Sequence, residues 1–210
     1  MPRAACSEPC ACHRSDMKAV LAAILASVVG MFIYGRVVGS PATTTYVGIT
    51  LVLVAVLWWI NRTAVFPMPV LWGLAVVGVG NMLGGVLLID GNTLYLTPII
   101  GPLRYDKIFH AGACGVAAWA AWHATGQWSG GSIRPGPRRF VAILMAAGAG
   151  AVVEIVEFTG VNIFPETNVG DYGNNMLDLV ANLTGAFSVA AVLGRSRVEA
   201  GLIRARITGP

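Results

Sequence analysis

Residues 19–34 read AVLAAILASVVGMFIY, a stretch without a charged residue that directly follows Lys18. With its flanks, this apolar run extends from Met17 to about Val38. A helix of that length crosses the ~30 Å hydrocarbon layer of a bilayer, whereas core helices of soluble domains have shorter apolar runs. The run therefore predicts a transmembrane helix.

Five further apolar runs follow at short intervals. They cover residues 43–60, 70–89, 105–124, 140–158 and 174–193. Each is long enough to span a bilayer if some tilt or fraying is allowed. The run over 43–60 ends near Trp58 and Trp59, which fits the aromatic belt of a membrane interface. The sequence therefore predicts an all-α polytopic helical membrane bundle with six transmembrane helices.

The composition agrees with this fold class. Of 210 residues, 56% are hydrophobic and 11% are charged, whereas soluble domains have about 25% charged residues. Six spans of roughly 20 residues leave no room for a separate soluble domain. The net charge of +4 would suit nucleic acid, but the basic residues flank apolar runs and form no single patch. We expect the lipid bilayer as a partner and no nucleic acid.

The basic residues also predict the orientation, because positively charged loops stay in the cytoplasm. Eleven lie on one side of the predicted bundle: Arg3, Arg14, Lys18, Arg62, Arg134, Arg138, Arg139, Arg195, Arg197, Arg204 and Arg206. Three lie on the other: Arg36, Arg104 and Lys107. This split predicts that both termini are cytoplasmic and that segments 90–105 and 159–173 are extracytoplasmic.

The predicted organisation is a cytoplasmic tail over residues 1–16, a six-span membrane domain over 17–194 and a basic cytoplasmic tail over 195–210. The first tail contains Cys6, Cys10, Cys12 and His13, whose spacing matches no common zinc or iron–sulfur pattern. We expect an unstructured tail, with metal binding as the alternative. The first span also resembles a signal peptide, but no clean cleavage site follows it.

Polar residues gather in the last three predicted spans, where each ionisable group costs at least ~2.5–3.5 kcal/mol to insert. They are Asp106, Lys107 and His110 in the fourth span, Glu154 and Glu157 in the fifth, and Asp171, Asn174, Asn175, Asp178 and Asn182 in the sixth. The predicted orientation places all of them toward the extracytoplasmic side.

Helical spacing places these residues on one face of each helix, since residues three or four apart share a face. The stripes are Asp106, His110, Ala113 and Ala117; Ala146, Gly150, Glu154 and Glu157; and Asp171, Asn175, Asp178, Asn182 and Gly185. Small residues allow membrane helices to approach closely. We therefore expect the three stripes to face one another around a shared pocket.

Several kinds of chemistry fit such a pocket. In a structural clamp, Lys107 and His110 neutralise the carboxylates. A divalent metal ion such as magnesium, manganese or zinc would suit oxygen ligands with one histidine, and the candidate ligands are Asp178, Asp171, His110 and Glu154. Alternatively, Glu154, Glu157 and His110 are candidate catalytic acids and bases. The other pocket residues are Asp106, Lys107, Asn175 and Asn182.

Three motifs in the C-terminal half resemble known membrane proteins. The run DKIFH at 106–110, EIVEF at 154–158 and GDYGNNMLDLVANLTGA at 170–186 resemble the corresponding motifs of VanZ-like proteins and of the related family containing the inner-membrane protein YjdF, which is the closer match. The resemblance covers residues 105–190. The family's characteristic residues fall on Asp106, His110, Glu154, Glu157, Asp171, Asp178 and Asn182.

This resemblance implies a multi-pass protein of the bacterial inner membrane with a role in the cell envelope. We therefore expect a protein that acts on or senses an envelope component, with an envelope lipid or glycolipid as ligand. The alternatives are a membrane-embedded hydrolase of an envelope lipid, a structural or assembly partner, and a proton- or cation-coupled transporter. Transport is disfavoured because the inner half of the last span has only Ser188 as a polar side chain.

Overall fold

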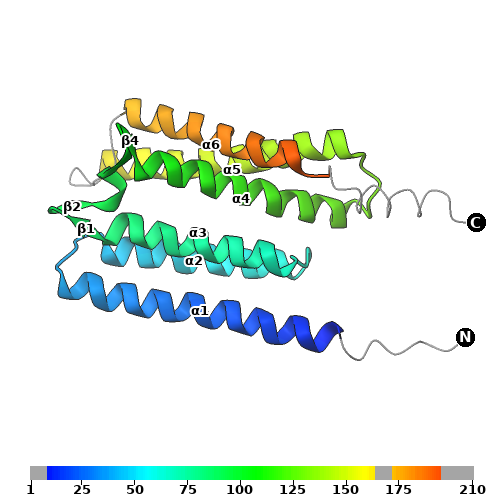
Figure 1. The fold of residues 1–210 in the computed structure, drawn as a ribbon, viewed down its shortest axis with the longest axis horizontal. Coiled ribbons are helices and arrows are strands. Elements are labelled where there is room, and N and C mark those ends of the chain that lie inside the picture. Colours follow the sequence, from blue (N-terminus) through cyan, green and yellow to red (C-terminus); the bar gives the residue numbers. More distant parts are fainter. Residues whose placement is uncertain (1–8, 164–171, 195–210) are drawn as a thin grey trace, which may run out of the picture.

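The computed structural model describes residues 9–163 and 172–194, which form a bundle of long helices (Figure 1). The described helices are α1 (Pro9–Val37), α2 (Thr43–Asn61), α3 (Met68–Val86), α4 (Tyr105–Trp128), α5 (Pro135–Ile163) and α6 (Tyr172–Val192). The prediction of an all-α membrane bundle is confirmed.

Five helices are long and apolar enough to cross a membrane. The qualifying segments are Met17–Val37, Thr43–Asn61, Met68–Val86, Pro135–Thr159 and Tyr172–Val192. Large apolar side chains such as Trp59, Val76 and Ile155 point outward and are 64–68% exposed, as expected for surfaces in contact with lipid. Helix α4 has 24 residues but is more polar, so length and composition alone do not establish it as a sixth span.

The predicted tails extend beyond the described part of the chain. Helix α1 begins at Pro9, ahead of the span that starts at Met17. Cys6 and the basic tail over 195–210 lie outside the described residues, and the side chains of Cys10, Cys12 and His13 are not described either.

The segment between α3 and α4 contains short β-structure that the sequence analysis did not predict. Strands β1 (Leu88–Ile89) and β2 (Asn92–Thr93) form one antiparallel hairpin, and β3 (Pro98–Ile100) and β4 (Leu103–Arg104) form a second. A short 3₁₀ helix, η1 (Leu94–Leu96), separates them. The first turn is Asp90–Gly91, and both residues have positive φ, as an Asp-Gly hairpin turn requires.

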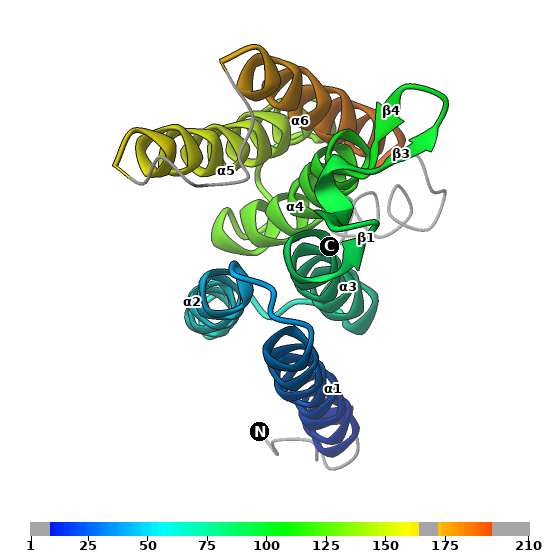
Figure 2. The same ribbon diagram turned by 90° about the vertical axis from the view of Figure 1, so that its left-hand side faces the viewer.

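The helices form two groups of three that meet along α3 and α4 (Figure 2). Helices α1, α2 and α3 pack together, and α4 packs most extensively against α6 and also against α5. The start of α1 and the end of α6 lie at one end of the bundle, and both hairpins lie at the opposite end (Figure 1). The first turns of α4 and α6 are therefore both at the hairpin end.

Small residues bring α4, α5 and α6 close together. A Cβ atom on Gly185 of α6 would collide with the backbone of Ala111 on α4, and one on Gly150 of α5 would lie 2.8 Å from the Asn182 side chain. Such close approach is typical of membrane helices, which associate through packing of small residues.

Replacing Gly185 with alanine should destabilise the protein by about 1–3 kcal/mol, because the added methyl group overpacks the α4–α6 contact. Thermal unfolding in detergent measures the change. Gly148→Ala is the control, since a Cβ atom there meets nothing within 4 Å and should leave the melting temperature unchanged or raise it. Equal melting temperatures for the two variants would show that the helices do not pack this closely.

Candidate functional site

Polar side chains from α4, α5 and α6 meet at the hairpin end of the bundle. The polar cluster consists of Asp106, Lys107 and His110 from α4, Glu154 from α5, and Asn174, Asn175, Asp178 and Asn182 from α6. Asp178 is completely buried, and His110, Glu154, Asn175 and Asn182 are also buried. The side chains of Asp106 and Lys107 are 13% and 14% exposed, so among the described residues these two give the cluster partial access to its surroundings.

The ammonium of Lys107 lies in a cage of oxygen atoms. Its Nζ donates to Asp178 Oδ1 at 2.6 Å, to Asp106 Oδ2 at 2.9 Å, and to Asn174 Oδ1 at 2.8 Å and the Asn174 backbone oxygen at 3.3 Å. The Asn174 amide donates to Asp178 Oδ2 at 2.8 Å and so holds this carboxylate from the other side. These contacts join α4 to α6.

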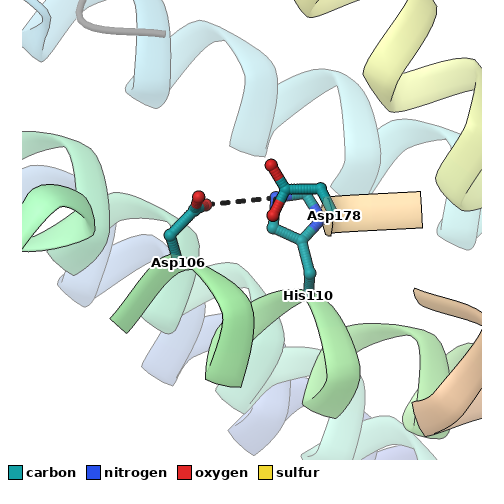
Figure 3. A group of neighbouring side chains, drawn as sticks. All are labelled: Asp106, His110 and Asp178. Atoms are coloured by element: carbon teal, nitrogen blue, oxygen red, sulfur yellow. Dashed lines mark ion pairs between the residues drawn. The ribbon is translucent and has the colours of Figure 1, made fainter. Parts of the chain in front are cut away.

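His110 lies between carboxylates from different helices. Its Nε2 is 3.3 Å from Asp106 Oδ1 and 3.9 Å from Asp178 Oδ1. Figure 3 shows these three side chains. Its Nδ1 is 3.2 Å from Glu154 Oε1. A protonated imidazole can donate to acids on both sides, whereas a neutral one can donate to one side only.

Glu154 is held by two asparagines of α6. Asn175 donates to its Oε2 and Asn182 to its Oε1, both at 3.1 Å. Asn182 in turn accepts a hydrogen bond from the Cys114 thiol at 3.1 Å. Each glutamate oxygen therefore has an amide donor.

Cys114 is a cluster neighbour that was not predicted from the sequence. The predicted stripe continued from His110 to Ala113 and Ala117, but the buried face of α4 runs through Cys114 and Ala118. Nothing in the sequence marked Cys114 as a polar contact, because a single buried cysteine behaves as a small apolar residue.

Two predicted site residues lie apart from the cluster's hydrogen bonds. Glu157 is half-buried on α5, one turn beyond Glu154, and has no hydrogen-bond or ion-pair partner among the described residues. Asp171 lies outside the described residues. The structure therefore brings together all the other predicted pocket residues.

The charges of the polar cluster and the neighbouring Glu157 do not balance. Four carboxylates (Asp106, Glu154, Glu157 and Asp178) face two bases, Lys107 and His110, so four negative charges oppose at most two positive ones. An uncompensated charge is costly in a low-dielectric environment. Within the described residues, this imbalance leaves an excess of negative charge that protons or a further cation would offset.

A metal ion has a candidate position in the cluster. Asp106, His110 and Asp178 each offer one ligand atom, and these atoms lie within 4.8 Å of one another. The Lys107 ammonium already contacts both carboxylates, however. A divalent ion at this position would have to displace Lys107.

The cluster is closed on its inner side. Below Asn182, the packed interior of α4, α5 and α6 consists of Cys114, Ala118, Ala146 and Ala186. These small side chains supply no polar path toward the other end of the three-helix group within the described residues. Among the described residues, the polar cluster therefore ends at the level of Asn182 and Cys114.

A second polar network fastens the hairpin segment to the first three helices. The Tyr95 hydroxyl donates to Asn81 Oδ1 at 2.9 Å, and Asn81 donates to Thr50 at 3.3 Å. The Tyr95 ring packs against Gly84, where a Cβ atom would collide with it. Burial raises the pKa of the Tyr95 phenol well above its usual range, so this hydroxyl remains a donor.

These features define an integral membrane protein with a buried ionic cluster near one membrane surface. The sequence model of a family described as "predicted membrane protein (DUF2238)" matches residues 17–199, and the chain belongs to that family. No match is found among curated proteins or solved structures. The family match supports a membrane protein but does not support the VanZ-like or YjdF-like assignment.

Replacing Lys107 with methionine should destabilise the protein by about 3–5 kcal/mol, because it removes the nearest countercharge of the buried Asp178 carboxylate. Most of that loss should be recovered in the double variant Lys107→Met/Asp178→Asn, which removes both charges. Thermal unfolding in detergent measures both effects, and Arg104→Met, at an exposed position, serves as the control. A single variant as stable as the wild type would contradict the oxygen cage.

Proposed function

We propose that this chain is a six-span protein of the bacterial inner membrane whose polar cluster binds a proton or cation from the extracytoplasmic side and thereby acts on or senses an envelope component. The excess of carboxylates over bases carries the proposal. A purely structural cluster gains nothing from unbalanced charge in a membrane, whereas a site that takes up a cation requires it.

The sixth span in this proposal is α4. Its 24 residues correspond to about 36 Å of helix, and it packs between α3 on one side and α5 and α6 on the other. The charged residues of α4, Asp106 and Lys107, contact other residues of the polar cluster rather than lipid. With six crossings, the start of α1 and the end of α6 share one side, and the basic residues favour the cytoplasm for that side.

The bound cation is a proton or a divalent metal ion. Carboxylate oxygens are the preferred ligands of hard divalent cations, and one histidine also suits zinc or manganese. Asp106, His110 and Asp178 have the required spacing. Glu157, which has no polar partner in the described part of the chain, supplies a further anionic group on the same side.

A second candidate function is hydrolysis of an envelope lipid. It is favoured by the position of His110 between Asp106 and Glu154, at 3.3 and 3.2 Å, because carboxylates that orient a histidine make it an effective acid or base. The transporter alternative is less favoured, because the apolar layer below Asn182 offers no continuing path.

The proposed topology predicts the location of reporter fusions. Fusions after Arg139 and after Pro210 should report the cytoplasm, and fusions near Gly91 or Glu166 should report the extracytoplasmic side, because positively charged segments are retained inside. Paired reporters, each active on one side only, measure the location. An extracytoplasmic C-terminus would contradict the six-span arrangement.

The proposed cation site predicts that Glu154→Gln and Asp178→Asn insert and purify normally yet lose function. An amide has the shape of a carboxylate, but it neither titrates nor replaces an anionic ligand well. Glu157→Gln should be less severe, because Glu157 lies nearer the outer end of α5. The assays are complementation of an envelope-stress phenotype and thermal unfolding with and without divalent cations.

If Glu154→Gln and Asp178→Asn both retain full activity, the cluster is a structural clamp. In a clamp, Glu154→Gln or Glu157→Gln would be nearly neutral or stabilising, because an amide has the shape of a carboxylate and the cost of desolvating a charge disappears.

A further inference from the structure

A shallow apolar groove runs along the outside of the seam between α4 and α6. Its volume is about 310 Å³, at the lower end of the ~300–1,000 Å³ typical of small-molecule sites. Its lining includes Ala111, Gly115 and Trp119 from α4 and Thr184, Gly185 and Val189 from α6. The Thr184 hydroxyl donates a hydrogen bond to the Val180 backbone oxygen at 2.7 Å. A ligand in the groove would therefore contact mainly apolar atoms.

The groove begins about one helical turn from the polar cluster on α4. Lys107, Ala111, Gly115 and Trp119 follow one another at intervals of four residues and therefore share one stripe of α4. Ala111 lies about 6 Å along the helix from Lys107. The contact between Lys107 and Asn174 bridges α4 and α6 just above the groove. A long molecule in the groove would therefore have one end at this bridge.

The β3–β4 hairpin lies at the same end of the bundle as the polar cluster. Figures 1 and 2 both place it at this end, and it contacts α4. It exposes Ile99, Ile100 and Leu103, which are 49%, 67% and 42% accessible. An exposed apolar patch at a bundle end is unfavourable in water and favours contact with a membrane. The hairpin therefore indicates that this end of the bundle, with the polar cluster, lies at the level of lipid headgroups.

We propose that the groove binds one acyl chain of a membrane lipid whose hydrogen-bond-donating head lies against Asp106 and the Lys107–Asn174 bridge. The apolar lining fits a hydrocarbon chain. The excess of carboxylate oxygens fits a head with N–H or O–H donors, since such acceptors need donors when they are desolvated. The headgroup part rests on the proposed function, because it takes the polar cluster as the place where the envelope component binds.

Two glycines provide a matched test of the groove. Gly112 lies in the groove lining and Gly148 lies on the exposed face of α5, and a Cβ atom on either meets nothing within 4 Å. Gly112→Leu fills the groove without a clash, whereas Gly148→Leu adds the same side chain elsewhere.

The experiment is a titration of the delipidated full chain in detergent, followed by native mass spectrometry. The probes are dioleoyl phosphatidylethanolamine, which has N–H donors in its head, and dioleoyl phosphatidylcholine, which has none. We expect the wild type to prefer the ethanolamine lipid. Gly112→Leu should bind it about tenfold more weakly, because chain contacts are lost, and Gly148→Leu should bind it as the wild type does.

Four results would overturn this proposal. Unchanged binding in Gly112→Leu, or equal losses in both variants, would show that the groove holds no chain. Equal affinity for the two lipids would reject the position of the head. A dimeric wild type that becomes monomeric in Gly112→Leu with unchanged lipid binding would assign the groove to a second copy of the chain.

The outcome is separable from that of the proposed function. Selective loss of lipid in Gly112→Leu, together with full activity of Glu154→Gln and Asp178→Asn, would keep the lipid groove and reject the cation site. Unchanged lipid binding in Gly112→Leu, with inactive Glu154→Gln and Asp178→Asn variants, would reject the groove and keep the cation site.

Discussion

The cage around the Lys107 ammonium is the interaction on which the α4–α6 packing depends. Two carboxylates, an amide oxygen and a backbone oxygen surround the ammonium. Three of these four oxygens belong to Asn174 and Asp178 of α6. In a low-dielectric environment neither Lys107 nor the fully buried Asp178 is tolerated alone. The pair therefore fixes the register of α6 against α4, and this register places Gly185 against Ala111.

The same register positions the rest of the cluster. One turn further along, His110 meets Glu154, and Asn182 connects Glu154 to Cys114. Among the described residues, helix α5 makes no ion pair with Lys107. It joins the polar cluster through the contacts of Glu154 with His110 and Asn182. Gly150 packs closely against Asn182 on the inner side of the cluster. Beyond this contact, the buried side chains between the three helices are small and apolar.

The sequence was sufficient to predict the helices and most of the cluster, because both follow from local periodicity. Length and apolarity define each span, and polar residues three or four apart necessarily share a face. Three features depend on tertiary packing and were missed: the short hairpins after Val86, the insertion of Tyr95 against Gly84, and the bond from Cys114 to Asn182. The Asp90–Gly91 pair was a usable signal for the first hairpin.

Pairing of the carboxylates does not by itself distinguish a clamp from a working site. Any buried acid in a membrane protein must be paired or protonated for the chain to insert and fold, so the partners of Asp106, Asp178 and Glu154 are expected under either reading. Glu157 is the informative residue, because it is half-buried and unpaired among the described residues. A clamp would have no use for a fourth acid beside Glu154, since it only adds repulsion. An acid at such a position is consistent with a site that gains and loses a proton or cation as it functions.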